Sequence, residues 1–110
     1  MKVSELTRSL DLEILQGTYQ DRELTGAYTS DLLSDVMAHA EDVEVLVTIQ
    51  SHKNTVAVAT LAGVAAILVC NGRPVPEDMI SAAADEQIGI FRSSRDQFTI
   101  SGELYRLIFG

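Results

Sequence analysis

Basic side chains gather in the predicted loops, and they are the residues best suited to bind a ligand. Five of the eight Lys and Arg residues lie in the loops at 16–25, 50–54, 71–75 and 92–95. These five cations are Arg22, Lys53, Arg73, Arg92 and Arg95. The last three loops follow predicted strands and contain no Asp or Glu. Because guanidinium and ammonium groups form charge-assisted hydrogen bonds to phosphate and carboxylate, the pattern predicts a site for a small anion.

A second interpretation is that each cation is solvated or paired with a nearby acid. Surface charges of this kind are common and contribute little to stability, so they need no ligand to explain them. Candidate acids are Asp21, Glu23 and Asp96. The two interpretations differ in geometry. Ligands of open α/β sheets bind outside the carboxyl ends of the strands, where helix N-termini add exposed N–H donors. The ligand hypothesis therefore predicts that Arg22, Lys53 and Arg73 converge within one cleft.

His52 is the other candidate for chemistry, because it follows a predicted strand directly. Its imidazole could hydrogen-bond a phosphate, relay a proton or serve only a structural bond. His39 is the sole further histidine, so we predict no metal site and no cofactor. An enzyme using His52 and Asp21 as acid and base ranks below the binding hypotheses, since no nucleophile is paired with a base. Cys70 ends an apolar run and is predicted to be a buried packing residue. We therefore predict no catalytic site.

Strands and helices alternate along the chain. Strands are predicted at 12–15, 26–28, 43–49, 64–70 and 88–91. Helices are predicted at 3–10, from 29 or 30 to 40, at 55–62, from 76 to about 84 and from 94 to 108. This alternation predicts one α/β domain over residues 1–110, with a mostly parallel sheet, flanking helices and right-handed crossovers.

Capping residues support two of these helices. Asn54 is a suitable N-cap and Gly63 a suitable stop for helix 55–62, which is apolar all round and is therefore predicted to be nearly enclosed. Ser94 and Gln97 predict a capping box for the last helix. Gly102 within that helix suggests a close contact there, because glycine is an unfavourable helix residue.

Composition narrows the class of protein. The chain has 110 residues, a formal charge of −8 and a pI near 4.5, which argues against nucleic acid and anionic membrane surfaces as partners. The single cysteine predicts a reducing, cytoplasmic compartment. No apolar segment near residue 1 resembles a signal peptide, and the run 61–70 is shorter than the roughly 20 residues that span a bilayer.

Three ordered motifs resemble the DRTGG domain family. The first is Asp21-Arg22-x-Leu24-Thr25-Gly26, and the second is Asp31-Leu32-Leu33-Ser34-Asp35-Val36-Met37. The third is His52-x-Asn54-x-Val56-Ala57-Val58-Ala59. The resemblance covers residues 3–108. One departure is Ala27, which follows Gly26 where the motif has a paired glycine; Gly72 is an alternative counterpart of that glycine. If the family needs an unusual backbone angle at the paired position, Ala27 departs from it.

The resemblance implies an α/β fold similar to the N-terminal domain of HPr kinase/phosphorylase, which is related to the nucleotide-contacting domain of Mur ligases. Members of the family are commonly regulatory appendages of CBS pairs, phosphotransacetylases or pyrophosphatases, they tend to form dimers, and they are not catalysts by themselves. We therefore expect a stand-alone regulatory or sensor domain that binds a small anionic, nucleotide-like ligand and acts through a homodimer or a partner enzyme. The alternative is a purely structural dimerisation or interaction module without a ligand.

The motif positions and the basic loops together define the predicted ligand-binding residues. They are Asp21, Arg22, Thr25, Gly26, His52, Lys53, Asn54, Asn71, Gly72 and Arg73. A dimer would also protect the edges of a small sheet, and the apolar tail at 107–109 is one candidate surface for it.

Overall fold

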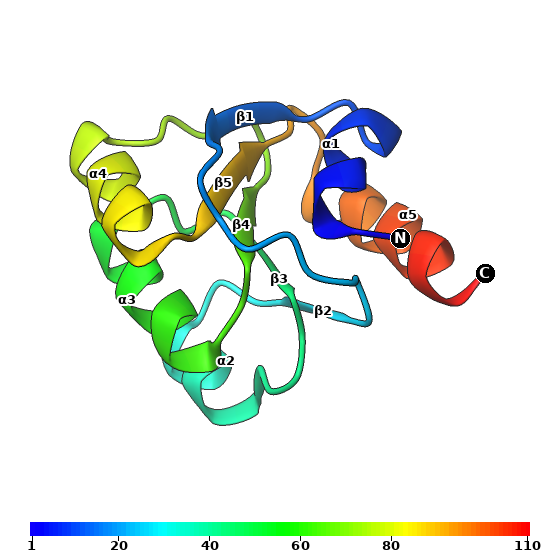
Figure 1. The fold of residues 1–110 in the computed structure, drawn as a ribbon, viewed down its shortest axis with the longest axis horizontal. Coiled ribbons are helices and arrows are strands. Elements are labelled where there is room, and N and C mark those ends of the chain that lie inside the picture. Colours follow the sequence, from blue (N-terminus) through cyan, green and yellow to red (C-terminus); the bar gives the residue numbers. More distant parts are fainter.

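Five strands form one mixed sheet in the order β1–β5–β4–β3–β2 (Figure 1). The computed structural model describes all residues from 1 to 110. The strands are β1 (Glu13–Gln16), β2 (Ala27–Thr29), β3 (Val45–Thr48), β4 (Ala66–Val69) and β5 (Gly89–Arg92). The helices are η1 (Val3–Glu5), α1 (Leu6–Ser9), α2 (Leu33–His39), α3 (Lys53–Ala62), α4 (Glu77–Glu86) and α5 (Gln97–Phe109). The predicted α/β fold with a mostly parallel sheet is confirmed.

The direction of β1 decides where a long loop runs. Strands β2 to β5 are parallel, and each pairs with the next one along the chain. Strand β1 pairs antiparallel with β5, with Gln16 beside Ile90 and Glu13 beside Arg92. Strand β1 therefore ends at the edge of the sheet where the parallel strands begin. We call this the amino edge, and the opposite one the carboxyl edge.

Helices cover both faces of the sheet (Figure 1). Helices α2, α3 and α4 pack on one face, where Leu46, Ile67 and Ile90 contribute to an apolar cluster. The η1–α1 segment and α5 cover the other face, where Leu68 and Phe91 are buried. Strands β3 and β4 are buried along their whole length, as expected for strands covered on both faces.

Helix α3 exists as predicted, but its cap and its burial differ. Gly63 ends it in the left-handed conformation at φ 77°, as expected. The N-cap is His52, whose Nδ1 accepts from the backbone N–H of Asn54 at 3.3 Å, so the prediction of an Asn54 cap is wrong. The prediction of near-complete enclosure is also wrong. Leu61 is 73% exposed, because α3 packs on the sheet along one side only.

Details at the ends of other helices also depart from the predictions. Helix α5 is capped by Asp96, whose carboxylate accepts from the backbone N–H of Thr99 at 2.8 Å, rather than by a box of Ser94 and Gln97. Gly102 makes no close contact, since a Cβ placed there would meet no atom within 4 Å. Helix α2 begins at Leu33, a few residues later than predicted. None of the helices is long and apolar enough to cross a membrane.

Candidate functional site

The predicted ligand-binding residues separate into two groups at opposite edges of the sheet. Asp21, Arg22, Thr25 and Gly26 lie in the loop 17–26, which runs along the amino edge from β1 to β2. The other six follow β3 or β4 and lie at the carboxyl edge; they are His52, Lys53, Asn54, Asn71, Gly72 and Arg73. The prediction that Arg22 converges with Lys53 and Arg73 in one cleft is therefore wrong. Its loop precedes a parallel strand, whereas the other two loops follow one.

Gln16 at the end of β1 and the loop 17–26 after it are hydrogen-bonded to the chain just ahead of three neighbouring strands. Near β5, the Gln16 side-chain amide donates to the carbonyl of Ile88 at 2.7 Å. Ahead of β4, the Arg22 guanidinium donates to the carbonyl of Gly63 at 2.6 Å. Ahead of β3, the backbone N–H of Thr25 donates to the carboxylate of Glu44 at 2.5 Å. The loop therefore forms a rim along the amino edge.

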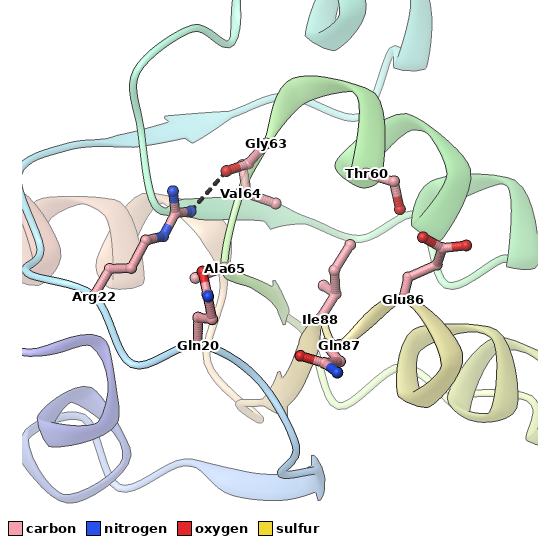
Figure 2. A pocket seen from close by; sticks show the side chains of 9 residues that line it. All are labelled: Gln20, Arg22, Thr60, Gly63, Val64, Ala65, Glu86, Gln87 and Ile88. Atoms are coloured by element: carbon pink, nitrogen blue, oxygen red, sulfur yellow. Dashed lines mark hydrogen bonds between the residues drawn. The ribbon is translucent and has the colours of Figure 1, made fainter.

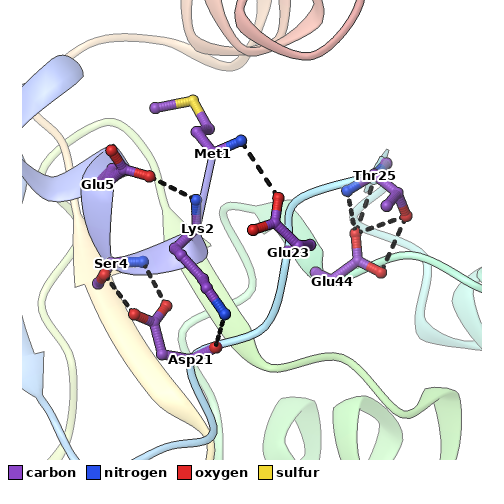
Figure 3. Close-up of polar contacts among 9 residues, drawn as sticks. Met1, Lys2, Ser4, Glu5, Asp21, Glu23, Thr25 and Glu44 are labelled. Carbon is purple, nitrogen blue, oxygen red and sulfur yellow. Dashed lines mark hydrogen bonds and ion pairs between the residues drawn. The ribbon is translucent and has the colours of Figure 1, made fainter.

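Most polar groups of the first motif already have partners within the protein (Figure 3). The Asp21 carboxylate accepts from the backbone N–H of Ser4 at 2.8 Å and from its hydroxyl at 2.5 Å. The buried Glu44 carboxylate accepts from the Thr25 hydroxyl at 2.9 Å and from the backbone N–H of Gly26 at 3.1 Å. These contacts serve the fold whether or not a ligand is present.

The backbone conformation at Ala27, where the motif has a second glycine, is one that alanine adopts without strain. Ala27 lies in β2 and is not among the residues with positive φ, so its position does not require glycine. Gly26 is more constrained by space, since a Cβ there would lie 3.1 Å from Cγ1 of Val43. Gly72, the alternative counterpart, does have a positive φ of 57°.

A cavity of about 210 Å³ opens on the amino edge beside Arg22 (Figure 2). Figure 2 shows Gln20 and Arg22 on one side, with Glu86 and Gln87 from the end of α4 facing them. The walls thus carry one guanidinium, one carboxylate and two carboxamides. The lining residues are Gln20, Arg22, Thr60, Gly63, Val64, Ala65, Glu86, Gln87 and Ile88.

Two further hollows continue this cavity along the groove between α3 and α4. The first, of about 510 Å³, shares Thr60 and Glu86 with the cavity and extends to Lys53 and Asn54. The second, of about 410 Å³, shares Lys53 and contains the carboxylates of Glu77, Asp78 and Asp85. Three acids around a single Lys53 make that end of the groove unfavourable for an anion.

The remaining carboxyl-edge residues build a turn. The backbone N–H groups of Asn71 and Gly72 donate to the carbonyls of Arg95 and Ser93, at 2.9 and 2.8 Å. Both residues have positive φ, 62° and 57°. Arg73 is exposed and lines none of the hollows. Asn71, Gly72 and Arg73 therefore do not form part of any hollow.

The alternative of paired cations applies to two of the five basic residues. Arg92 binds Glu13 through a pair of nitrogens at 3.0 Å each, and Arg95 binds Glu103 at 2.8 Å. The acids differ from those expected, since Asp21, Glu23 and Asp96 are bonded elsewhere. The Arg92 bonds lower the pKa of the Glu13 carboxyl, first through the hydrogen bond and then through the opposite charge.

The residues considered for an enzyme are not assembled into one site. Asp21 lies at the amino edge and His52 at the carboxyl edge, so they cannot act as an acid–base pair. Cys70 is fully buried, as predicted. Its burial, with the nearby charges of Asp31 and Asp96, raises the pKa of the thiol to about 11. A thiol with that pKa is a poor nucleophile near neutral pH.

Two acidic residues at the strand edges were assigned the wrong role or missed. Asp31 lies within the helix predicted from residue 29 or 30, but it precedes α2, and its Oδ1 accepts three hydrogen bonds that join β2, β3 and α5. The donors are the Thr48 hydroxyl at 3.0 Å, the Ile49 backbone N–H at 2.8 Å and the Gln97 amide at 2.9 Å. Glu44 was not singled out. The signal that could have identified it is that Glu44 is the only charged residue in the predicted strand 43–49, and a charge in a buried strand needs hydrogen-bond partners.

Together these observations define a small α/β domain with a polar cavity on the amino edge of its sheet. Among solved structures, the chain resembles the CBS and DRTGG domains of the regulatory region of Clostridium perfringens pyrophosphatase, complexed with its activator diadenosine tetraphosphate. The TM-score is 0.72 at 12% sequence identity. The match covers 93% of this chain and 45% of that one. At this identity the similarity establishes the fold. No protein-family model and no curated protein matches the sequence.

Proposed function

We propose that this chain is a non-catalytic regulatory domain that binds a small anionic, nucleotide-like ligand in the amino-edge cavity. The observation that carries the proposal is the set of groups around the cavity, with a guanidinium on one side and a carboxylate and carboxamides on the other. The similarity to a regulatory region that holds diadenosine tetraphosphate supports it. The chain would transmit binding through a dimer or to a partner enzyme in a reducing, cytoplasmic compartment.

The chemistry of the cavity favours a nucleotide over a bare phosphate. One guanidinium nitrogen of Arg22 donates a hydrogen bond to the carbonyl of Gly63. The guanidinium has further N–H donors that can bind a phosphate. Glu86 can accept from ribose hydroxyls or an exocyclic amine, whereas it would repel inorganic phosphate. The carboxamides of Gln20 and Gln87 can donate to and accept from a base.

The size of the hollow suggests where the rest of such a ligand would lie. Pockets for compact ligands typically measure about 300–1,000 Å³, so the cavity of about 210 Å³ holds only part of a nucleotide. The adjoining hollow of about 510 Å³ has Val56, Ala57 and Leu61 in its walls. We propose that the phosphate binds Arg22 and that the remainder lies along the start of this groove.

Thermal melting with a panel of nucleotides and inorganic phosphate tests the proposal. A ligand at about 100 times its dissociation constant adds about 2.7 kcal/mol, a rise of roughly 10 °C or more for a domain of this size. Arg22→Gln should abolish the rise, while the matched variant Arg73→Gln should retain it. A rise that survives Arg22→Gln but is lost in Arg73→Gln would move the site to the carboxyl edge.

The alternative is a structural module without a ligand. The observation that favours it is the internal bonding of the first motif, in which Asp21, Arg22 and Thr25 each bind another part of the same chain. This alternative predicts no melting shift with any nucleotide, together with loss of stability when those contacts are removed. It also predicts that association between copies does not respond to nucleotide.

A further inference from the structure

Helix α5 carries a stripe of aromatic side chains on the face that points away from the sheet. Phe98, Tyr105 and Phe109 are 89%, 67% and 63% exposed. Ile100 and Leu104 on the opposite face of the same helix are buried. Residues 98, 102, 105 and 109 follow the 4-3-4 spacing that places them in one line along a helix. The stripe therefore consists of Phe98, Gly102, Tyr105 and Phe109, and it contains no charge.

The order of large and small residues in the stripe is symmetric about its centre. If a second α5 packs antiparallel against the first, with a two-fold axis between positions 103 and 104, Phe98 faces Phe109 of the second copy. Gly102 then faces Tyr105 of that copy. A Cβ at Gly102 would meet nothing within 4 Å, so the surface there is open to a large side chain. Such reciprocal pairing is what a two-fold interface requires.

A hollow beside the stripe fits the same arrangement. It has a volume of about 150 Å³, lies between β2 and α5, and is lined by Ala27, Ile108, Tyr105 and Phe109 among others. The rings of Tyr105 and Phe109 pack against each other with their centroids 4.8 Å apart, and they form one wall of the hollow. In the antiparallel pair, Phe98 of the second copy lies opposite this hollow and can enter it.

We propose that the α5 stripe is a homodimer interface in which Tyr105 packs over Gly102 of the second copy and Phe98 enters the hollow by β2. This inference rests on the dimeric part of the proposed function and names its surface. An aromatic side chain can bury about 200 Å². With their exposed fractions, the three aromatic side chains of the stripe could bury on the order of 400 Å² per copy. This is half of the roughly 800 Å² that each partner buries in a typical interface. We therefore expect a weak, reversible dimer.

Sedimentation velocity over a roughly hundredfold range of protein concentration tests the interface. The unaltered chain should pass from monomer to dimer, and Phe98→Glu should raise the dissociation constant at least tenfold. The matched control is Met37→Glu on α2, which is 58% exposed and should leave the dissociation constant unchanged. A chain that stays monomeric throughout, or a dimer that Phe98→Glu leaves intact, would overturn the proposal.

Gly102→Leu separates an effect on the interface from an effect on folding. Leucine is a better helix former than glycine, and the position is open, so the monomer should melt at the same or a higher temperature. The dimer should weaken, because the leucine fills the space assigned to Tyr105 of the second copy. If Gly102→Leu dimerises as well as the unaltered chain, this packing is refuted. Nucleotide-dependent melting of monomeric Phe98→Glu tests ligand binding separately, since the Arg22 cavity lies away from α5.

Discussion

Removing the Glu44 carboxylate should destabilise the domain more than any other single change at the amino edge. The side chain is only 9% exposed, and it accepts from two backbone N–H groups and one hydroxyl in the loop 17–26. Each hydrogen bond to a charged group contributes about 1.5–3 kcal/mol. Water can reach part of the loop after the change, so we expect Glu44→Ala to cost about 2–4 kcal/mol. Such a loss is a large fraction of the 5–15 kcal/mol typical of small domains.

Urea denaturation measures this cost directly. Thr25→Val removes only the hydroxyl from the cluster and should cost about 1 kcal/mol. Glu41→Ala is the matched control, because Glu41 is an exposed acid in the same loop between α2 and β3. This substitution should change stability by less than about 0.5 kcal/mol. If Glu44→Ala behaves like Glu41→Ala, the carboxylate does not anchor the loop and the account of the amino edge fails.

Three further predictions concern residues near the carboxyl edge of the sheet. Asp31→Ala should cost about 1–3 kcal/mol in urea denaturation, because the Ile49 N–H loses its acceptor; a negligible cost would contradict its bridging role. Cys70, with a pKa near 11, should react with a thiol reagent at about pH 8 roughly a hundredfold more slowly than a free cysteine, until the protein unfolds. The Thr99 backbone N–H lowers the pKa of Asp96, so the stability it contributes is present above its unfolded pKa and lost as pH falls through its folded pKa. Asp96→Ala should therefore reduce stability at neutral pH and have little effect near about pH 2. An equal loss of stability at both pH values would contradict this pH dependence.

The order and type of the elements could be predicted because local signals mark them. Gly63 ends α3 in the left-handed conformation, and Pro76 immediately precedes α4. The continuous apolar run at 64–70 predicts a buried strand, and β4, within this run, is the middle strand of the sheet. Each of these features depends on a few neighbouring residues.

The placement of Arg22 could not be predicted, because it depends on a contact far along the chain. Strand β1 pairs antiparallel with β5, and this long-range pairing sends the loop 17–26 along the amino edge. This loop carries a basic residue, as the loops at the carboxyl edge do, and a cation alone does not show at which edge a loop lies. Its two acids, Asp21 and Glu23, set it apart from those loops but do not place it either. The cavity was missed for the same reason. Gln20 and Gln87 are distant in sequence and meet only in the folded chain.

Mapping backbone amide shifts during a nucleotide titration locates the bound ligand without altering the protein. A ligand bound at the amino edge should concentrate the shifts at 20–22, 63–65 and 86–88, around the cavity. Shifts confined to 52–54 and 71–73, or no shift with any nucleotide, would contradict the proposed site.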